Sequence, residues 1–138
     1  LVREASARLE MIADTYLSVN TPAQCALPEL LHLAPAIRRQ IHARTAGNRR
    51  WLQGQRNPLS SWDLVPAEGG WYAVLRVPRI MTEERWCLAL ATEDRLLVHP
   101  GYFFDFDTEA FLVVSTLLPE ADFRDALGRL IRRIDAVR

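Results

Sequence analysis

Two short segments constrain the fold of this chain more than any other part of its sequence. In the first, a glycine pair at residues 69–70 precedes residues 71–77, whose aromatic and β-branched side chains predict a strand. Glycine adopts backbone conformations closed to other residues, so this segment predicts a flexible turn that leads into a buried strand. In the second, an apolar run at residues 96–98 ends at a Pro-Gly pair, and three aromatic residues follow. Three rings are too many to leave exposed, so we expect this loop to pack against other residues.

Hydrophobic periodicity and turn residues predict eight elements in the order helix, helix, strand, strand, helix, strand, strand, helix. Their expected ranges are 2–16, 22–55, 63–65, 71–77, 83–92 with Thr82 as cap, a strand ending at 100, 111–115 and 119–137. Pro28 and Pro35 each remove a backbone donor, so the second helix is expected to kink or to divide into two shorter helices. The pattern predicts a two-layer α/β domain, with a small mixed, largely antiparallel sheet packed with helices.

Composition limits the partners of the chain. Its 138 residues suffice for one domain with a single core, and its 17 acidic and 17 basic residues give a formal charge of zero. No overall field therefore attracts nucleic acid or an anionic membrane, and basic pairs at residues 49–50 and 132–133 are interpreted as solvated helix faces. No apolar run has the length of a membrane helix. The spacing of Cys25 and Cys87 does not match that of metal ligands. Two cysteines so far apart are typical of reduced thiols, so we expect a cytoplasmic protein.

The order of these segments resembles the C-terminal small domain of the fold-type I pyridoxal-phosphate-dependent aminotransferases of class I/II. The resemblance covers nearly the whole chain and rests on five features. These are the link at residues 16–24, the glycine pair before an aromatic strand, the strand ending in Pro-Gly-x-x-Phe at 100–104, the strand at 111–115 and the amphipathic helix at 119–137. The resemblance implies that residues 1–138 form one small domain, that a large cofactor-binding domain lies upstream, and that the parent protein is a homodimer.

The resemblance also implies an activity. The parent enzyme would transfer an amino group between an amino acid and a 2-oxo acid, while the small domain closes over the cleft and contributes to substrate recognition. The residues that we expect to bind substrate are Gly69, Gly70, Trp71, Arg76 and Tyr102.

The first departure from the family pattern is that all 17 basic residues are arginine and none is lysine. In these enzymes a lysine amine holds the cofactor aldehyde as a Schiff base, a linkage that a permanently protonated guanidinium cannot form. We therefore expect no catalytic and no cofactor-binding residue in this chain, and pyridoxal 5'-phosphate to be bound by the upstream domain. The start at Leu1, which is not a methionine, agrees with a piece of a longer protein.

The second departure is at Val113. Many relatives have an arginine at this position of the strand, where it binds the substrate α-carboxylate as a two-pronged ion pair. The carboxylate partner therefore lies elsewhere, or the substrate has no carboxylate at that place. Arg76 is a candidate replacement, because it has the fork geometry and lies on a strand that begins close to Gly70. The alternative is that Arg76 reaches solvent at a sheet edge.

Two further functions remain open. The first is a non-catalytic, aminotransferase-like module that acts through protein contacts. The second is a pyridoxal-phosphate-dependent lyase or synthase on the same scaffold, which the loss of an arginine at Val113 allows.

Other chemistries have little support in the sequence. The histidines form no His-x-x-x-His pair and have no cysteine pair nearby, so no metal site is expected. Ser115 lacks a Gly-x-Ser-x-Gly elbow, and Asp105 and Asp107 are interpreted as solvated loop acids. Five aromatic residues would form a wall beside a ligand or lie in the core; we expect most in the core and one or two at the cleft. These are Trp71, Tyr72, Tyr102, Phe103 and Phe104.

Overall fold

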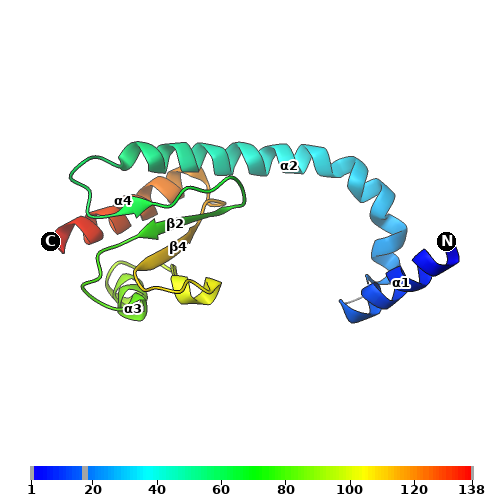
Figure 1. Ribbon diagram of the computed structural model, residues 1–138. Helices are drawn as coiled ribbons and strands as arrows, with labels where there is room; N and C mark the ends of the chain where they lie inside the picture. Colours follow the sequence, from blue (N-terminus) through cyan, green and yellow to red (C-terminus); the bar gives the residue numbers. More distant parts are fainter. Residues whose placement is uncertain (1, 17–18, 138) are drawn as a thin grey trace. The chain divides into compact units, whose positions relative to one another are not determined.

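The computed structural model of the protein describes residues 2–16 and 19–137 (Figure 1). Contacts between Cα atoms divide the chain into two compact units, residues 1–39 and residues 40–138. Leu17 and Ser18, which belong to the link expected at residues 16–24, lie outside the described residues.

The first unit consists of helix α1 (Val2–Thr15) and the beginning of helix α2 (Thr21–Gln55). The side chain of Asn20 caps α2 by accepting a hydrogen bond of 2.9 Å from the backbone N–H of Ala23. The helix continues without interruption through Pro28 and Pro35, so of the two outcomes expected there, a kink or a division, the division into two shorter helices is not found. Each proline removes a single backbone donor, and the hydrogen bonds of the neighbouring turns maintain the helix on either side. No described residue of α1 is buried.

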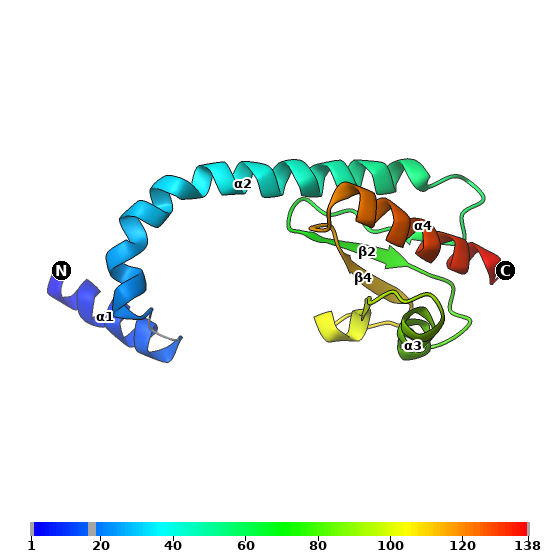
Figure 2. The same cartoon turned by 180° about the vertical axis from the view of Figure 1, so that it is seen from behind.

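The second unit contains a four-stranded sheet packed with helices (Figures 1 and 2). Its strands, in the spatial order β1-β2-β4-β3, are β1 (Asp63–Leu64), β2 (Tyr72–Arg76), β4 (Phe111–Ser115) and β3 (His99–Pro100). Its other elements are helices α3 (Glu83–Glu93) and α4 (Glu120–Ala136) and the short 3-10 helix η1 (Gly101–Phe104). The predicted α/β fold is confirmed; the sheet was expected to be mixed and largely antiparallel, and every pairing of the described strands is antiparallel.

Neighbouring residues of β2 and β4 point to opposite faces of the sheet. The cross-strand pairs Ala73–Val114 and Leu75–Leu112 are buried, and the helices pack against them. The helical part of this core comprises Leu52 of α2, Trp86 and Leu90 of α3, and Phe123, Leu127, Leu130 and Ile134 of α4. Each large apolar side chain buried in this way stabilises the fold by roughly 1.5–3 kcal/mol. We call the opposite side the open face; it carries residues 72, 74 and 76 of β2 and 111, 113 and 115 of β4, which lie outside the main hydrophobic cluster, although Val113 is itself buried.

The apolar run at residues 96–98 lies outside the strands, because β3 contains only His99 and Pro100. The chain leaves α3 with Arg95 in a left-handed conformation (φ 53°), and the N–H of Leu96 then binds the carbonyl of Leu90 over 2.9 Å. This hydrogen bond belongs to the end of the helix, so the run begins as a helix terminus and not as a strand. Leu97 is 96% exposed.

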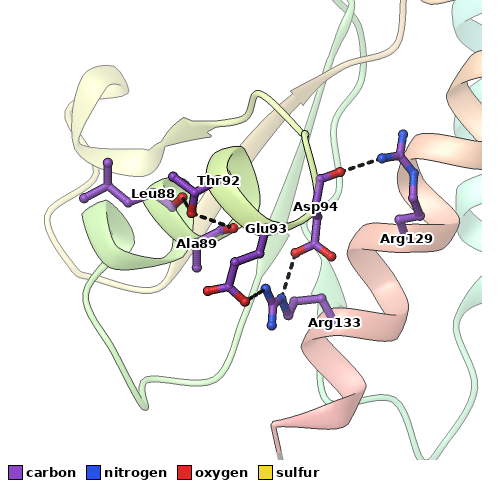
Figure 3. Close-up of polar contacts among 7 residues, drawn as sticks. All are labelled: Leu88, Ala89, Thr92, Glu93, Asp94, Arg129 and Arg133. Atoms are coloured by element: carbon purple, nitrogen blue, oxygen red, sulfur yellow. Dashed lines mark hydrogen bonds and ion pairs between the residues drawn. The ribbon is translucent and has the colours of Figure 1, made fainter.

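Two arginines of α4 attach the end of α3 (Figure 3). Arg129 donates through Nη1 to the carbonyl of Asp94, and Arg133 donates through Nε to the Asp94 carboxylate over 2.7 Å. Arg133 also pairs with Glu93. The hydrogen bonds to Glu93 and then to Asp94 raise the pKa of Arg133 above its ordinary value. This arginine was interpreted as part of a solvated face; its side chain is 28% exposed, and its acidic partners, 39 and 40 residues away, also attach it to the end of α3.

The expected helix at residues 83–92 is confirmed with its cap, since the side chain of Thr82 accepts a hydrogen bond from the N–H of Arg85. Its first residue, Glu83, is only 1% exposed. The carboxylate of Glu83 accepts hydrogen bonds from the backbone N–H groups of Tyr102 (3.0 Å) and Phe111 (2.7 Å). A buried carboxylate requires such partners, so Glu83 joins the start of α3 to η1 and β4.

Gly101 should not tolerate a side chain. A Cβ there would lie 2.7 Å from the Phe111 Cβ and 2.8 Å from Oε1 of Glu83. We expect Gly101→Ala to lower the free energy of unfolding by about 1–3 kcal/mol, measured by urea denaturation. Gly54→Ala is the matched control in α2, where a Cβ meets nothing within 4 Å, and it should stabilise by up to about 1 kcal/mol. Equal effects of the two substitutions would contradict this account of Gly101.

Candidate functional site

The glycine loop, residues 66–71, leads into β2. Gly70 has a φ of +79°, which favours glycine, whereas a Cβ at Gly69 or Gly70 would meet no atom within 4 Å. The side chain of Trp71 is half exposed, and its carbonyl accepts hydrogen bonds from the N–H (2.7 Å) and hydroxyl (2.8 Å) of Thr116. The loop is therefore tied to the end of β4 at Trp71 and is open to solvent at its glycines.

The aromatic residues of η1 do not lie in the core. Tyr102, Phe103 and Phe104 are between 41% and 63% exposed. Trp71 and Tyr72 are exposed to a similar degree, so the expectation that most of the five aromatic residues lie in the core is wrong. The rings pack on one another instead: ring centroids are 5.0 Å apart for Tyr102 and Phe103 and 5.4 Å apart for Tyr72 and Phe104. Burial of a ring requires a covering surface, and the described residues supply none here.

The contact between Tyr72 and Phe104 places the end of the glycine loop beside η1. Two of the expected substrate-binding segments, the one with Trp71 and the one with Tyr102, therefore lie on the same part of the molecule. Arg76 is four residues further along β2, about 13 Å from Tyr72 along the strand. The roles of these residues in substrate binding stay predictions.

Val113 lies at the centre of the open face, between Val74 of β2 and His99 of β3. It is 2% exposed. Arg76 is on the same face, about 7 Å along the sheet from Val74, because residues two apart in a strand share a face. The Arg76 guanidinium has no hydrogen bond or ion pair with any residue that the structure describes, and it is exposed. Strand β2 lies between β1 and β4, so Arg76 reaches solvent from an interior strand and not from an edge strand.

Two residues that hold these loops were not found by sequence reasoning. Glu83 stands at the start of the predicted helix at residues 83–92, and nothing near it in the sequence indicates its N–H partners, which are 19 and 28 residues away. Arg49 was interpreted as part of a solvated face, but its guanidinium donates to three carbonyls in and beside the glycine loop. No local signal identifies such partners, because they lie 18 to 28 residues away and meet only in the folded chain.

The other candidate chemistries gain no support. In residues 2–16 and 19–137, no group of three or more His, Cys, Asp or Glu side chains could hold a metal ion. Both cysteines are free, and burial, followed by the charge of Glu83, raises the pKa of the Cys87 thiol to about 11, so this thiol is protonated at neutral pH. The Ser115 hydroxyl accepts a hydrogen bond from the N–H of Leu117. Within the same residues, none of the helices has the length and apolar character needed to cross a membrane.

An apolar cavity of about 380 Å³ lies beside the expected site and not within it. Its walls come from residues 96–98, the end of β4 and α4, and Ser115 is its one residue with a polar side chain. It contains none of the residues expected to bind substrate.

Comparison with known proteins supports a likeness of fold. No protein-family model and no curated relative matches the chain. Among solved structures, aspartate aminotransferase from Thermotoga maritima matches 95% of this chain with a TM-score of 0.71 and 21% identity. Aromatic aminotransferase from Pyrococcus horikoshii matches 71% with a TM-score of 0.62 and 18% identity. An Escherichia coli protein described as having a methionine aminotransferase function matches 87% with a TM-score of 0.58 and 21% identity.

The chain spans only 26–33% of the length of these three proteins. This partial coverage and the α/β fold fit a C-terminal small domain of fold-type I aminotransferases, as the order of the sequence motifs predicted.

The two glycines of the loop should respond differently to substitution. Gly70→Ala places a Cβ on a residue with φ +79° and should lower the free energy of unfolding by about 1–2 kcal/mol. Gly69→Ala is the matched control, since neither its backbone nor its surroundings oppose a Cβ, and it should change stability by less than about 0.5 kcal/mol. Thermal and urea denaturation measure both. Equal destabilisation would show that the Gly70 conformation is not what the loop requires.

Proposed function

We propose that this chain is the small domain of a pyridoxal-phosphate-dependent aminotransferase that transfers an amino group between an amino acid and a 2-oxo acid. The observation that carries the proposal is the match of 95% of the chain to one third of an aspartate aminotransferase. It is supported by the position of the glycine loop beside η1, on a side of the molecule where aromatic rings are exposed. Upstream of this domain we place the large domain, and the complete protein would be a cytoplasmic homodimer.

The proposed task of this domain is to recognise substrate and to close the cleft. Gly69, Gly70 and Trp71 would meet the substrate from the glycine loop, and Tyr102 from η1. These groups come from loops attached to a rigid sheet, which is an arrangement that positions binding groups while leaving them accessible. Closure would bring the exposed aromatic rings against the large domain and remove them from water.

The residues of this chain do not fit the attachment site of the cofactor. The chain contains no lysine, and no other side chain offers the primary amine that this attachment requires. We therefore place pyridoxal 5'-phosphate entirely on the large domain and assign no step of the reaction to it here.

Arg76 is the group that we propose for the substrate carboxylate. Its guanidinium is exposed and has no partner among the described residues, and it shares the open face with Val113. A guanidinium binds a carboxylate through two parallel hydrogen bonds, which neither Val113 nor Val74 can make. The absence of arginine at Val113 also leaves a lyase or synthase reaction as an alternative on the same scaffold.

A binding module is the second candidate function. It is favoured by the exposed apolar side chains of the first unit, among them Leu9, Ile12, Leu30 and Leu31, and by the absence of lysine. Such a module would act by covering these side chains with another protein.

The cofactor proposal is tested by the visible absorption spectrum of the protein expressed from its complete reading frame. We expect a yellow Schiff-base band that bleaches when particular amino acids are added, and the amino acids that bleach it identify the donor. A protein that stays colourless after addition of pyridoxal phosphate would exclude the enzyme and leave the binding module. A band that does not return with any 2-oxo acid would favour the lyase or synthase.

The Arg76 proposal is tested by Arg76→Gln in the complete protein. Loss of a charged hydrogen-bonded pair should raise KM for the amino acid about 10- to 100-fold. Arg79→Gln is the matched control, because Arg79 is exposed, follows β2 and has no ion pair with a described residue; its KM should stay unchanged. Amines that lack a carboxylate should be insensitive to both substitutions. An unchanged KM in Arg76→Gln would place the carboxylate partner on another residue.

A further inference from the structure

We propose that Arg49 of α2 is a positioning residue that sets the conformation of the glycine loop and, through it, the place of Trp71. This inference rests on the proposed function, since it assigns the loop a role in substrate binding. Arg49 itself touches no substrate in this proposal and acts only through the loop.

A single guanidinium binds three carbonyls of one short segment. Nη1 donates to the carbonyl of Ala67 over 2.9 Å, and Nη2 donates to those of Tyr72 over 2.8 Å and Gly69 over 3.4 Å. The first two distances are those of strong hydrogen bonds, and the third is longer. The planar, forked guanidinium reaches acceptors on both sides of the glycine pair at once, which the point charge of a lysine cannot do with the same geometry.

The loop has little else to hold it. Residues 66–72 are all exposed, and among the described residues no backbone–backbone hydrogen bond involves residues 66–70. The backbone bonds on either side are those from Val65 to Val74 and from Thr116 to Trp71. Between these two points, the hydrogen bonds from Arg49 provide the attachment of the loop to the sheet and helices.

The neighbouring residue Asn48 holds the segment after β4, to which Trp71 is bound. Asn48 is 1% exposed, and its Nδ2 donates to the carbonyls of Thr116 (3.0 Å) and Leu118 (2.9 Å). Thr116 in turn binds the carbonyl of Trp71, while Arg49 binds that of Tyr72. Two consecutive residues of α2 therefore hold the backbone at Trp71 and Tyr72: Asn48 acts on Trp71 through Thr116, and Arg49 binds Tyr72 directly.

The charge of Arg49 is not used in an ion pair with any residue that the structure describes. Its partners are neutral carbonyls at the surface, so it contributes to the order of the loop more than to the stability of the core. A positioning residue affects the order of the loop, whereas a purely structural residue would affect the stability of the whole domain. Removal of Arg49 should loosen residues 66–71 and leave the buried sheet face unchanged.

The test compares Arg49→Met and Arg49→Lys with Arg50→Met in the complete protein. Arg50 is the matched control, because it is the next residue of α2, is exposed and has no hydrogen bond or ion pair with a described residue. The first measurement is the rate of cleavage after Glu68, inside the loop, by a glutamate-specific protease. We expect this rate to rise about tenfold in both Arg49 variants and to stay unchanged in Arg50→Met, with cleavage after Glu93 and Glu120 unaltered.

The second measurement is steady-state kinetics with the amino acid that bleaches the cofactor band. We expect Arg49→Met to raise KM about tenfold, with cofactor content unchanged. Cleavage after Glu68 at the wild-type rate would overturn the proposal, and so would equal acceleration at all three glutamates, which indicates general unfolding. Absence of aminotransferase activity in the wild-type protein would exclude the proposed function, whereas the cleavage rates would still decide whether Arg49 holds the loop.

Discussion

The structure of residues 40–138 depends on the two unlike faces of strands β2 and β4. One face presents Ala73, Leu75, Leu112 and Val114 and is buried beneath three helices. Because side chains alternate, the other residues of the same strands necessarily point to the opposite side of the sheet. The apolar pairs therefore do two things at once: they bind the helices, and they determine which residues face away from them. Tyr72, Arg76 and Val113 owe their common direction to this core.

The loops at the ends of these strands are held by side chains of the helices. Arg49 binds carbonyls of the glycine loop, and Glu83 binds N–H groups of η1 and β4. The two residues have opposite charge because the loops present opposite groups, carbonyls in one case and N–H groups in the other. The guanidinium of Arg49 provides hydrogen-bond donors for the glycine loop, and the buried carboxylate of Glu83 provides acceptors for η1 and β4.

Local patterns in the sequence predicted the elements well. The cap at Thr82, the strand at residues 111–115 and the helix after Pro119 each depend on signals within a few residues, and the structure has all three. A kink or a division of α2 was expected at its prolines, and the division is not found, because a proline weakens a helix without determining whether the neighbouring turns hold it. The order of the elements was sufficient to indicate the fold that the aminotransferase structures share.

Burial and long-range contacts were predicted less well. Most of the five aromatic rings were expected in the core, yet all five are at least 41% exposed. The hydrophobicity of a ring indicates only that its burial is favourable, and it does not identify a surface that would bury the ring. The hydrogen-bond partners of Arg49 and Glu83 could not be predicted from the sequence, because residues 18 to 28 positions apart meet only after the sheet has formed.

The manner in which the loops are held has a consequence for how such a domain can diversify. Arg49 and Glu83 bind backbone atoms, so the side chains at positions 71, 102 and 103 take no part in those attachments. Exchange of these three side chains would alter the chemistry of this surface while the loop backbones keep their course. The course of the loops and the side chains that they expose therefore depend on separate sets of residues, so the exposed surface can change while the architecture is kept.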